Sequence, residues 1–185
     1  PEAVRQQAQS AWQGVVQKQK AASARAQAGA LDTLLKAVSS GDEKSARGAL
    51  FSLAQAAPQY AGTVSRAAQA ALGAAPTQSR AEVFNALYKQ TVQQPLEHKK
   101  LEQAFQAGQI SGRDYLLLAR QQAQNAGGAD RVAQRLVWGA VQRLCRKNGL
   151  PEKEAQDFQY ALFSQDLTPD AQAQMLKKMK EFYFM

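Results

Sequence analysis

Basic side chains recur every four residues along one stretch of this sequence. On a helix, steps of four place side chains on one slowly drifting face. No acidic residue follows Asp130 in this stretch to neutralise that face. A face of one sign repels itself, and phosphates lying against it relieve the repulsion, so the pattern predicts binding to a nucleic-acid backbone. The basic side chains are Arg131, Arg135, Arg143, Arg146 and Lys147.

Two further interpretations of this basic face stay open. It can be a solvated helix surface, or it can pair with the acidic residues that follow, Glu152, Glu154 and Asp157. Aromatic residues do not interleave with the basic ones, so we do not expect bases to stack here. If nucleic acid binds, contact with the phosphates makes the binding independent of base sequence.

The C-terminal stretch MLKKMKEFYFM combines an apolar helix face with lysines around the rest. A basic amphipathic helix with aromatic residues at its end suits a membrane surface or a groove in a partner protein. The alternative is a terminal helix that docks on the core of its own chain. The residues proposed for a membrane or partner contact are Met175, Met179, Phe182 and Tyr183.

Residue types that support catalysis are scarce. His98 and Cys145 are the only histidine and cysteine, which excludes a structural zinc site and an internal disulfide. We expect His98 at the surface near a helix kink, and Cys145 buried as a small apolar residue. The chain has no phosphate-binding glycine motif. The sequence therefore predicts a protein that is not an enzyme, with no cofactor, no metal and no small-molecule substrate.

The elements that must position these residues are all helical. Ala and Gln favour helices, and no strand alternation is present. We predict an all-α array of about eight or nine helices joined by short turns, with no sheet. Residues 2–28 form the first helix, with a narrow apolar stripe that includes Val4, Trp12 and Val15, and Gly29 ends it. A short second helix then carries Leu31, Leu34, Leu35 and Val38.

Capping residues place several other helix ends. Asp42, Ser111 and Thr168 are expected N-caps, and Thr77 or Ser79 is expected to cap the helix that follows them. Asp114 is placed to return a hydrogen bond to the Ser111 cap. Pro95 predicts a break near residues 93–94. Gly149 closes the basic helix, which is expected over residues 129–148.

A stretch of small and turn-forming residues, GAAPTQS at 73–79, is the best candidate boundary within the chain. It divides an Ala/Gln-rich helical segment, 1–75, from a helical domain, 76–185, that contains the basic helix. Both parts can equally belong to one continuous domain.

Length and charge limit the class of partner. The chain has 185 residues and a net charge of +8, which favours anionic partners such as nucleic acid, acidic proteins or anionic membrane surfaces. No apolar run is long enough for a transmembrane helix, and residues 1–20 lack the apolar core of a signal peptide.

The segment AGQISGRDYLLLARQ, residues 107–121, resembles the short helical units of bacteriophage internal virion (ejection) proteins and tape-measure-like proteins. The resemblance implies helical subunits that assemble into a virion core or a channel that conducts DNA. It assigns no catalytic residue. The matching residues are Gly108, Ile110, Ser111, Asp114, Tyr115 and Leu118.

These observations support three functional hypotheses. The first is a non-enzymatic structural or assembly protein of a phage virion that forms homo-oligomers and lies near DNA. The second is a protein that binds DNA non-specifically through phosphate contacts. The third is a helical effector that acts on membranes through its C-terminal helix. The expected location is the virion or the bacterial cytoplasm.

Overall fold

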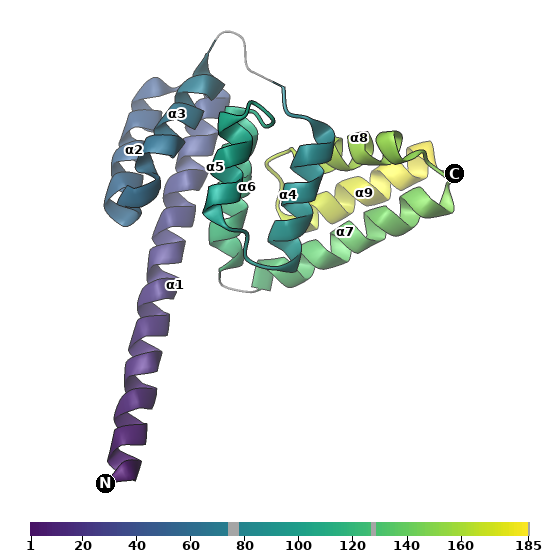
Figure 1. Ribbon diagram of the computed structural model, residues 1–185. Helices are drawn as coiled ribbons and strands as arrows, with labels where there is room; N and C mark the ends of the chain where they lie inside the picture. The colour runs from purple at the N-terminus through teal and green to yellow at the C-terminus, as the bar shows by residue number, and fades with distance from the viewer. Residues whose placement is uncertain (74–77, 127–128, 185) are drawn as a thin grey trace.

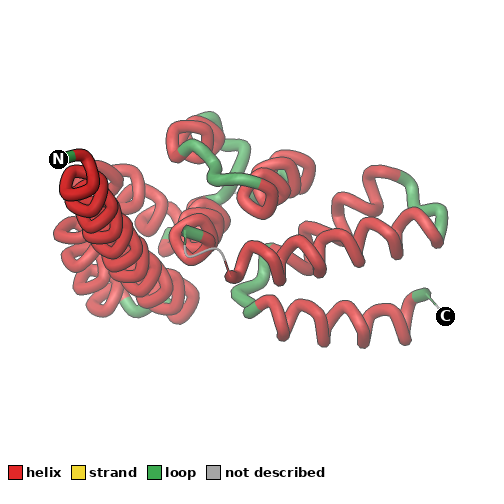
Figure 2. The backbone as a smooth tube through the Cα atoms, turned by 90° about the horizontal axis from the view of Figure 1, so that it is seen from below, coloured by secondary structure: helices red, strands yellow, loops and turns green. Residues whose placement is uncertain are grey.

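The computed structural model describes residues 1–73, 78–126 and 129–184, apart from the side chains of Ala129 and Tyr183. Within this part of the chain it contains nine α-helices and no strand, which confirms the all-α prediction (Figure 2). Every connection that the structure describes is short. The helices are α1 (Glu2–Ser40), α2 (Glu43–Ala56), α3 (Ala61–Leu72), α4 (Ala81–Gln93), α5 (His98–Gln106), α6 (Gly112–Asn125), α7 (Ala129–Lys147), α8 (Glu152–Phe163) and α9 (Pro169–Tyr183), with a 3-10 turn at Pro58–Tyr60.

Helix α6 is the central element of the fold. It packs against α1 and α3 on one side and against α4, α5 and α7 on the other. Figure 1 shows α1–α3 and α7–α9 on opposite sides of α4–α6. The α6 side chains Tyr115, Leu116, Leu117 and Leu118 are fully buried. The two segments expected from the sequence therefore meet along α6, and the boundary between them lies partly at residues 74–77, outside the described residues.

Helix α1 runs unbroken through Gly29, so the prediction that Gly29 ends the first helix is wrong. Glycine costs about 1 kcal/mol relative to alanine in a helix. Burial of Leu31, Leu34 and Leu35 against neighbouring helices outweighs that cost, because each buried leucine contributes about 1.5–3 kcal/mol. The helix ends instead at Gly41, whose φ of 73° is left-handed.

Most of the predicted helix ends are confirmed. The side chains of Asp42, Ser111 and Thr168 each accept a hydrogen bond from a backbone N–H in the first turn of their helix. Helix α4 ends at Gln93, as Pro95 predicts. Gly149 has a φ of 61° after the end of α7.

The expected cap of α4 and the expected capping box of α6 are both wrong. Arg80 precedes α4 without a side-chain cap, and Thr77 lies outside the described residues. Ser79 instead accepts a hydrogen bond from the backbone N–H of Ser111 and donates one to the Asp114 carboxylate. Ser79 thus bridges the two groups that were expected to bond directly, and ties the chain before α4 to the start of α6.

Candidate assembly and nucleic-acid interfaces

The basic face of α7 is not equally available along its length. The guanidinium of Arg135 donates hydrogen bonds to the carbonyls of Val92 and Gln93 at the end of α4. Arg131 is half-buried, and its Nε atom is fully buried. The N-terminal part of the predicted nucleic-acid face therefore includes one arginine that caps a neighbouring helix and one that is partly withdrawn from solvent. Two large apolar side chains, Val132 and Leu136, are 59% and 69% exposed beside them.

The C-terminal part of the same face is open to solvent. Arg143, Arg146 and Lys147 are exposed, and none of them forms an ion pair with a described acidic residue. A Cβ atom at Gly139 would lie 3.3 Å from Nη1 of Arg143, so this arginine extends back along the helix over the glycine. Within the described residues, the alternative of pairing with Glu152, Glu154 and Asp157 is not realised at ion-pair distance. Arg146 and Lys147 also lie in the last turn of α7, where the helix dipole favours cations.

The C-terminal helix docks on its own chain by most of its apolar face. Leu176 is buried, and Met175 and Met179 are half-buried against the core. Phe182 is 83% exposed, and the side chain of Tyr183 lies outside the described residues. Of the four residues proposed for a membrane or partner contact, Phe182 is therefore the one that points into solvent in the described structure. Among the described residues, no helix has the length and apolar character needed to span a membrane.

The first two thirds of α1 project away from the rest of the protein (Figure 1). None of residues 1–27 is buried, whereas Leu31, Leu34 and Leu35 are fully enclosed by other helices. At 1.5 Å per residue the projecting part of the helix is about 39 Å long. Its largest apolar side chains, Trp12 and Val4, are 68% and 63% exposed. The narrow apolar stripe predicted from the sequence is therefore exposed from Val4 to Ala22, and its last residue, Ala26, borders a groove against α2.

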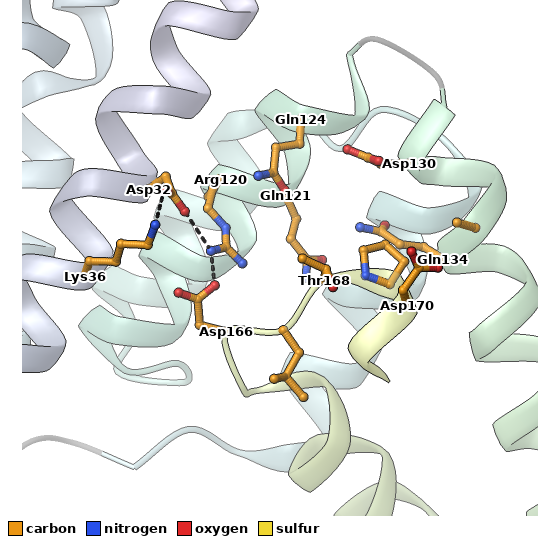
Figure 3. A pocket seen from close by; sticks show the side chains of 13 residues that line it. Asp32, Lys36, Arg120, Gln121, Gln124, Asp130, Gln134, Asp166, Thr168 and Asp170 are labelled. Atoms are coloured by element: carbon orange, nitrogen blue, oxygen red, sulfur yellow. Dashed lines mark hydrogen bonds and ion pairs between the residues drawn. The ribbon is translucent and has the colours of Figure 1, made fainter. Parts of the chain in front are cut away.

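An ionic joint at Arg120 connects three parts of the fold (Figure 3). The Arg120 side chain is 6% exposed, and its Nη1 lies 3.3 Å from Asp32 of α1 and pairs with Asp166 in the α8–α9 connection. Lys36 pairs with Asp32 at 2.9 Å from the solvent side. This joint was not predicted from the sequence. Its one signal is the lone charge of Arg120 directly after the apolar run YLLLA.

A polar cavity of about 430 Å³ lies beside the Arg120 joint. Asp130 and Asp170 line it from the first turns of α7 and α9, where the positive end of the helix dipole favours carboxylates. No group of three or more potential metal ligands occurs among the described residues. Asp130 and Asp170 are thus explained by the helix starts they occupy, and Asp32 and Asp166 by their pairing with Arg120.

His98 is not a surface residue, and that expectation is wrong. Its side chain is 12% exposed, and its ring centroid lies 3.7 Å from that of Tyr60. Nε2 of His98 forms a 3.0 Å hydrogen bond with the Tyr115 hydroxyl and lies 3.6 Å from the Glu102 carboxylate. Burial lowers the pKa of His98 below its ordinary value of 6.5, and Glu102 opposes this by a smaller amount. The rings of Tyr60 and Tyr115 thus shield most of the His98 side chain from water, although Lys99 and Lys100 follow it in the sequence.

Cys145 is buried at 5% exposure, as predicted. Burial raises the pKa of its thiol, so the nucleophilic thiolate is disfavoured at neutral pH.

Comparison with protein-family models, curated proteins and solved structures gives no significant match. The resemblance of residues 107–121 to phage internal virion proteins therefore stays a prediction.

Replacing Arg120 by Met tests the ionic joint. The change leaves Asp32 and Asp166 without their shared cation, and we expect the free energy of unfolding to fall by about 2–4 kcal/mol. This range allows for the partial exposure of both carboxylates. Urea denaturation monitored by circular dichroism measures it. Arg47→Met is the matched control, because Arg47 forms an exposed pair with Glu43 at 3.9 Å, and should cost less than about 1 kcal/mol. Equal costs for the two changes would contradict the role of the joint.

The buried site of His98 predicts a pH-dependent stability. In the folded protein His98 takes up a proton less readily than in the unfolded chain, so the unfolded state binds more protons as the pH falls below 6.5. Stability contributed by neutral His98 is complete above this pH and declines as acidification approaches the lower pKa of the folded state. We expect the difference in unfolding free energy between wild type and His98→Gln to shrink from pH 8 to pH 5, which is the range in which histidine titrates. Parallel profiles for the two proteins would show that His98 is not responsible.

Proposed function

We propose that this protein is a non-enzymatic helical structural protein that self-associates through the projecting part of α1. The observation that carries the proposal is the exposure of residues 1–27 in a helix whose other end is anchored in the core. Helices in water take most of their stability from packing of an apolar face rather than from propensity. A partner that covers the stripe of exposed Trp12, Val4 and Val15 would therefore stabilise the projecting helix.

A second copy of the same chain is the partner that fits this stripe best. Ala8, Ala11, Ala22 and Ala26 make up most of the remaining stripe, and small side chains allow two helix backbones to approach closely. One such stripe fits another because the same surface is presented by both copies in a two-fold pair. The resemblance of residues 107–121 to phage internal virion proteins supports a place for this assembly inside a phage particle.

Introducing negative charge on the α1 stripe tests self-association. We expect wild type to sediment as an oligomer in analytical ultracentrifugation, and Trp12→Glu with Val15→Glu to sediment as a monomer. The two carboxylates would have to be buried between helices, and burying an unpaired charge is costly. Amide hydrogen exchange of residues 2–27 should be slow in wild type and fast in this variant.

Gln6→Glu with Gln13→Glu is the matched control for this experiment. It adds the same two charges on the opposite side of the same exposed helix, and should leave the oligomer intact. A wild type that remains monomeric at every concentration would refute the proposal. So would equal loss of assembly in both variants, because it would show dependence on net charge rather than on the stripe.

The exposed end of the α7 basic face supports a second candidate function, contact with the DNA backbone. Arg143, Arg146 and Lys147 are exposed and have no described acidic partner within ion-pair distance. Such a face gains free energy when phosphates displace condensed counterions. Arg135 contributes less to this candidate, because its guanidinium already bonds to carbonyls of α4.

Fluorescence anisotropy with duplex DNA over a salt series tests this second function. Changing Arg143, Arg146 and Lys147 to Glu should reduce the log–log salt slope by about 0.9 per lost phosphate contact, about 2.7 in all. Lys44, Lys99 and Lys100 are exposed on other helices, and their change to Glu alters the net charge equally. If both triple variants lose the same slope, binding follows net charge and α7 is not the interface.

A further inference from the structure

The C-terminal ends of α7 and α9 enclose a pocket with a basic rim and an apolar floor. Its volume is about 300 Å³. Arg143 and Lys147 of α7 and Lys180 of α9 supply the rim, and all three are exposed. Leu144, Leu176 and Phe184 supply the floor. The basic helix and the C-terminal amphipathic helix, which are separate features in the sequence, therefore meet at one site.

The charges that the described residues bring to this pocket are of one sign. None of the described lining residues is acidic, and the structure pairs none of its three cations with a described carboxylate. The dipoles of α7 and α9 offset part of the repulsion, because Lys147 and Lys180 lie in the last turns of their helices. The dipoles do not account for the apolar floor, in which Leu144 and Leu176 are buried and Phe184 is half-buried.

We propose that this pocket binds an anionic lipid, with the headgroup on the basic rim and the start of the acyl chain on the apolar floor. Arg143 presents a planar fork of donors that matches phosphate or carboxylate oxygens, and the two lysines add point charges. The chain would lie over Leu144 and Leu176, which are 8% and 9% exposed, and would cover the half-buried ring of Phe184. A DNA phosphate would engage the rim alone and leave that ring partly in water, so the floor favours the lipid.

The surroundings of the pocket fit a membrane surface. Phe182 is 83% exposed two residues before Phe184, and an exposed aromatic side chain is suited to the membrane interface. Lys177 and Lys178 are exposed on the same helix and would be attracted to an anionic leaflet. This end of the molecule lies far from the N-terminus of α1 (Figure 1), so the proposal is independent of self-association through α1.

Two probes test the proposal with the full-length chain. Monomeric laurate, followed by calorimetry, reports on the pocket itself. Co-sedimentation with vesicles of equal parts phosphatidylglycerol and phosphatidylcholine, against phosphatidylcholine alone, reports on a membrane. We expect wild type to bind laurate and to sediment with the anionic vesicles only.

Three variants separate the pocket from general charge. Lys147→Glu with Lys180→Glu should weaken laurate binding about tenfold, since each reversal removes one partly exposed ion contact. Lys177→Glu with Lys178→Glu changes the net charge equally outside the pocket lining, and should change laurate affinity less than about twofold. Ala140 lines the pocket, and Ala140→Leu should reduce binding of laurate and of anionic vesicles by filling it without a change of charge.

Several results would overturn the proposal. Equal losses of laurate affinity in the two lysine variants would show that binding follows diffuse charge. Inorganic phosphate that binds as tightly as laurate would show a plain anion site, and unchanged binding by Ala140→Leu would show that the floor is not used. An acidic peptide with one apolar side chain that binds more tightly than laurate and the vesicles would assign the pocket to a protein partner. Circular dichroism of each variant establishes that it is folded.

Discussion

The arrangement of this protein depends on a buried arginine. Arg120 projects from the central helix α6 and holds carboxylates of α1 and of the α8–α9 connection, Asp32 and Asp166. A guanidinium enclosed to this degree is tolerated only where it is paired, because an unpaired buried charge costs several kcal/mol. The joint thereby fixes the base of the projecting helix and the start of α9 to the same element. The α1 stripe and the α9 side of the basic pocket belong to helices that this joint orients.

The interior of the protein and its two ends carry different kinds of side chain. The core is apolar and aromatic, with the ring of Tyr88 stacked against Trp138 and tilted against Phe163. The polar groups that are buried within it serve structure: Ser79 bridges two segments, and Asp114 also accepts a hydrogen bond from Tyr160. Burial and the Asp114 carboxylate raise the pKa of Tyr160 to about 12, so this hydroxyl remains a donor at physiological pH. The groups left for binding are at the two ends of the molecule.

Those two ends differ in the physical force they offer to a partner. Along α1 the exposed stripe is apolar and built largely of alanine, so association there gains from close backbone approach and removal of Trp12 from water. At the pocket between α7 and α9 the basic rim attracts any anion, and the apolar floor favours an anion that carries an apolar chain. Salt should therefore weaken association at the second end far more than at the first, because screening acts on exposed charges.

The sequence by itself determined the class of fold and most helix ends, because a helix is specified by interactions within four residues. Caps such as Asp42, Ser111 and Thr168 bond to backbone groups in their own first turn, and the apolar spacing marks the buried face. Only the tertiary structure decided which charged groups remain available. Arg135 and Arg143 look alike in the sequence, yet one caps α4 and the other lines a pocket with Lys180. Whether a charged side chain is buried or paired depends on contacts between segments that are distant in the sequence, and the spacing of residues within one helix does not predict those contacts.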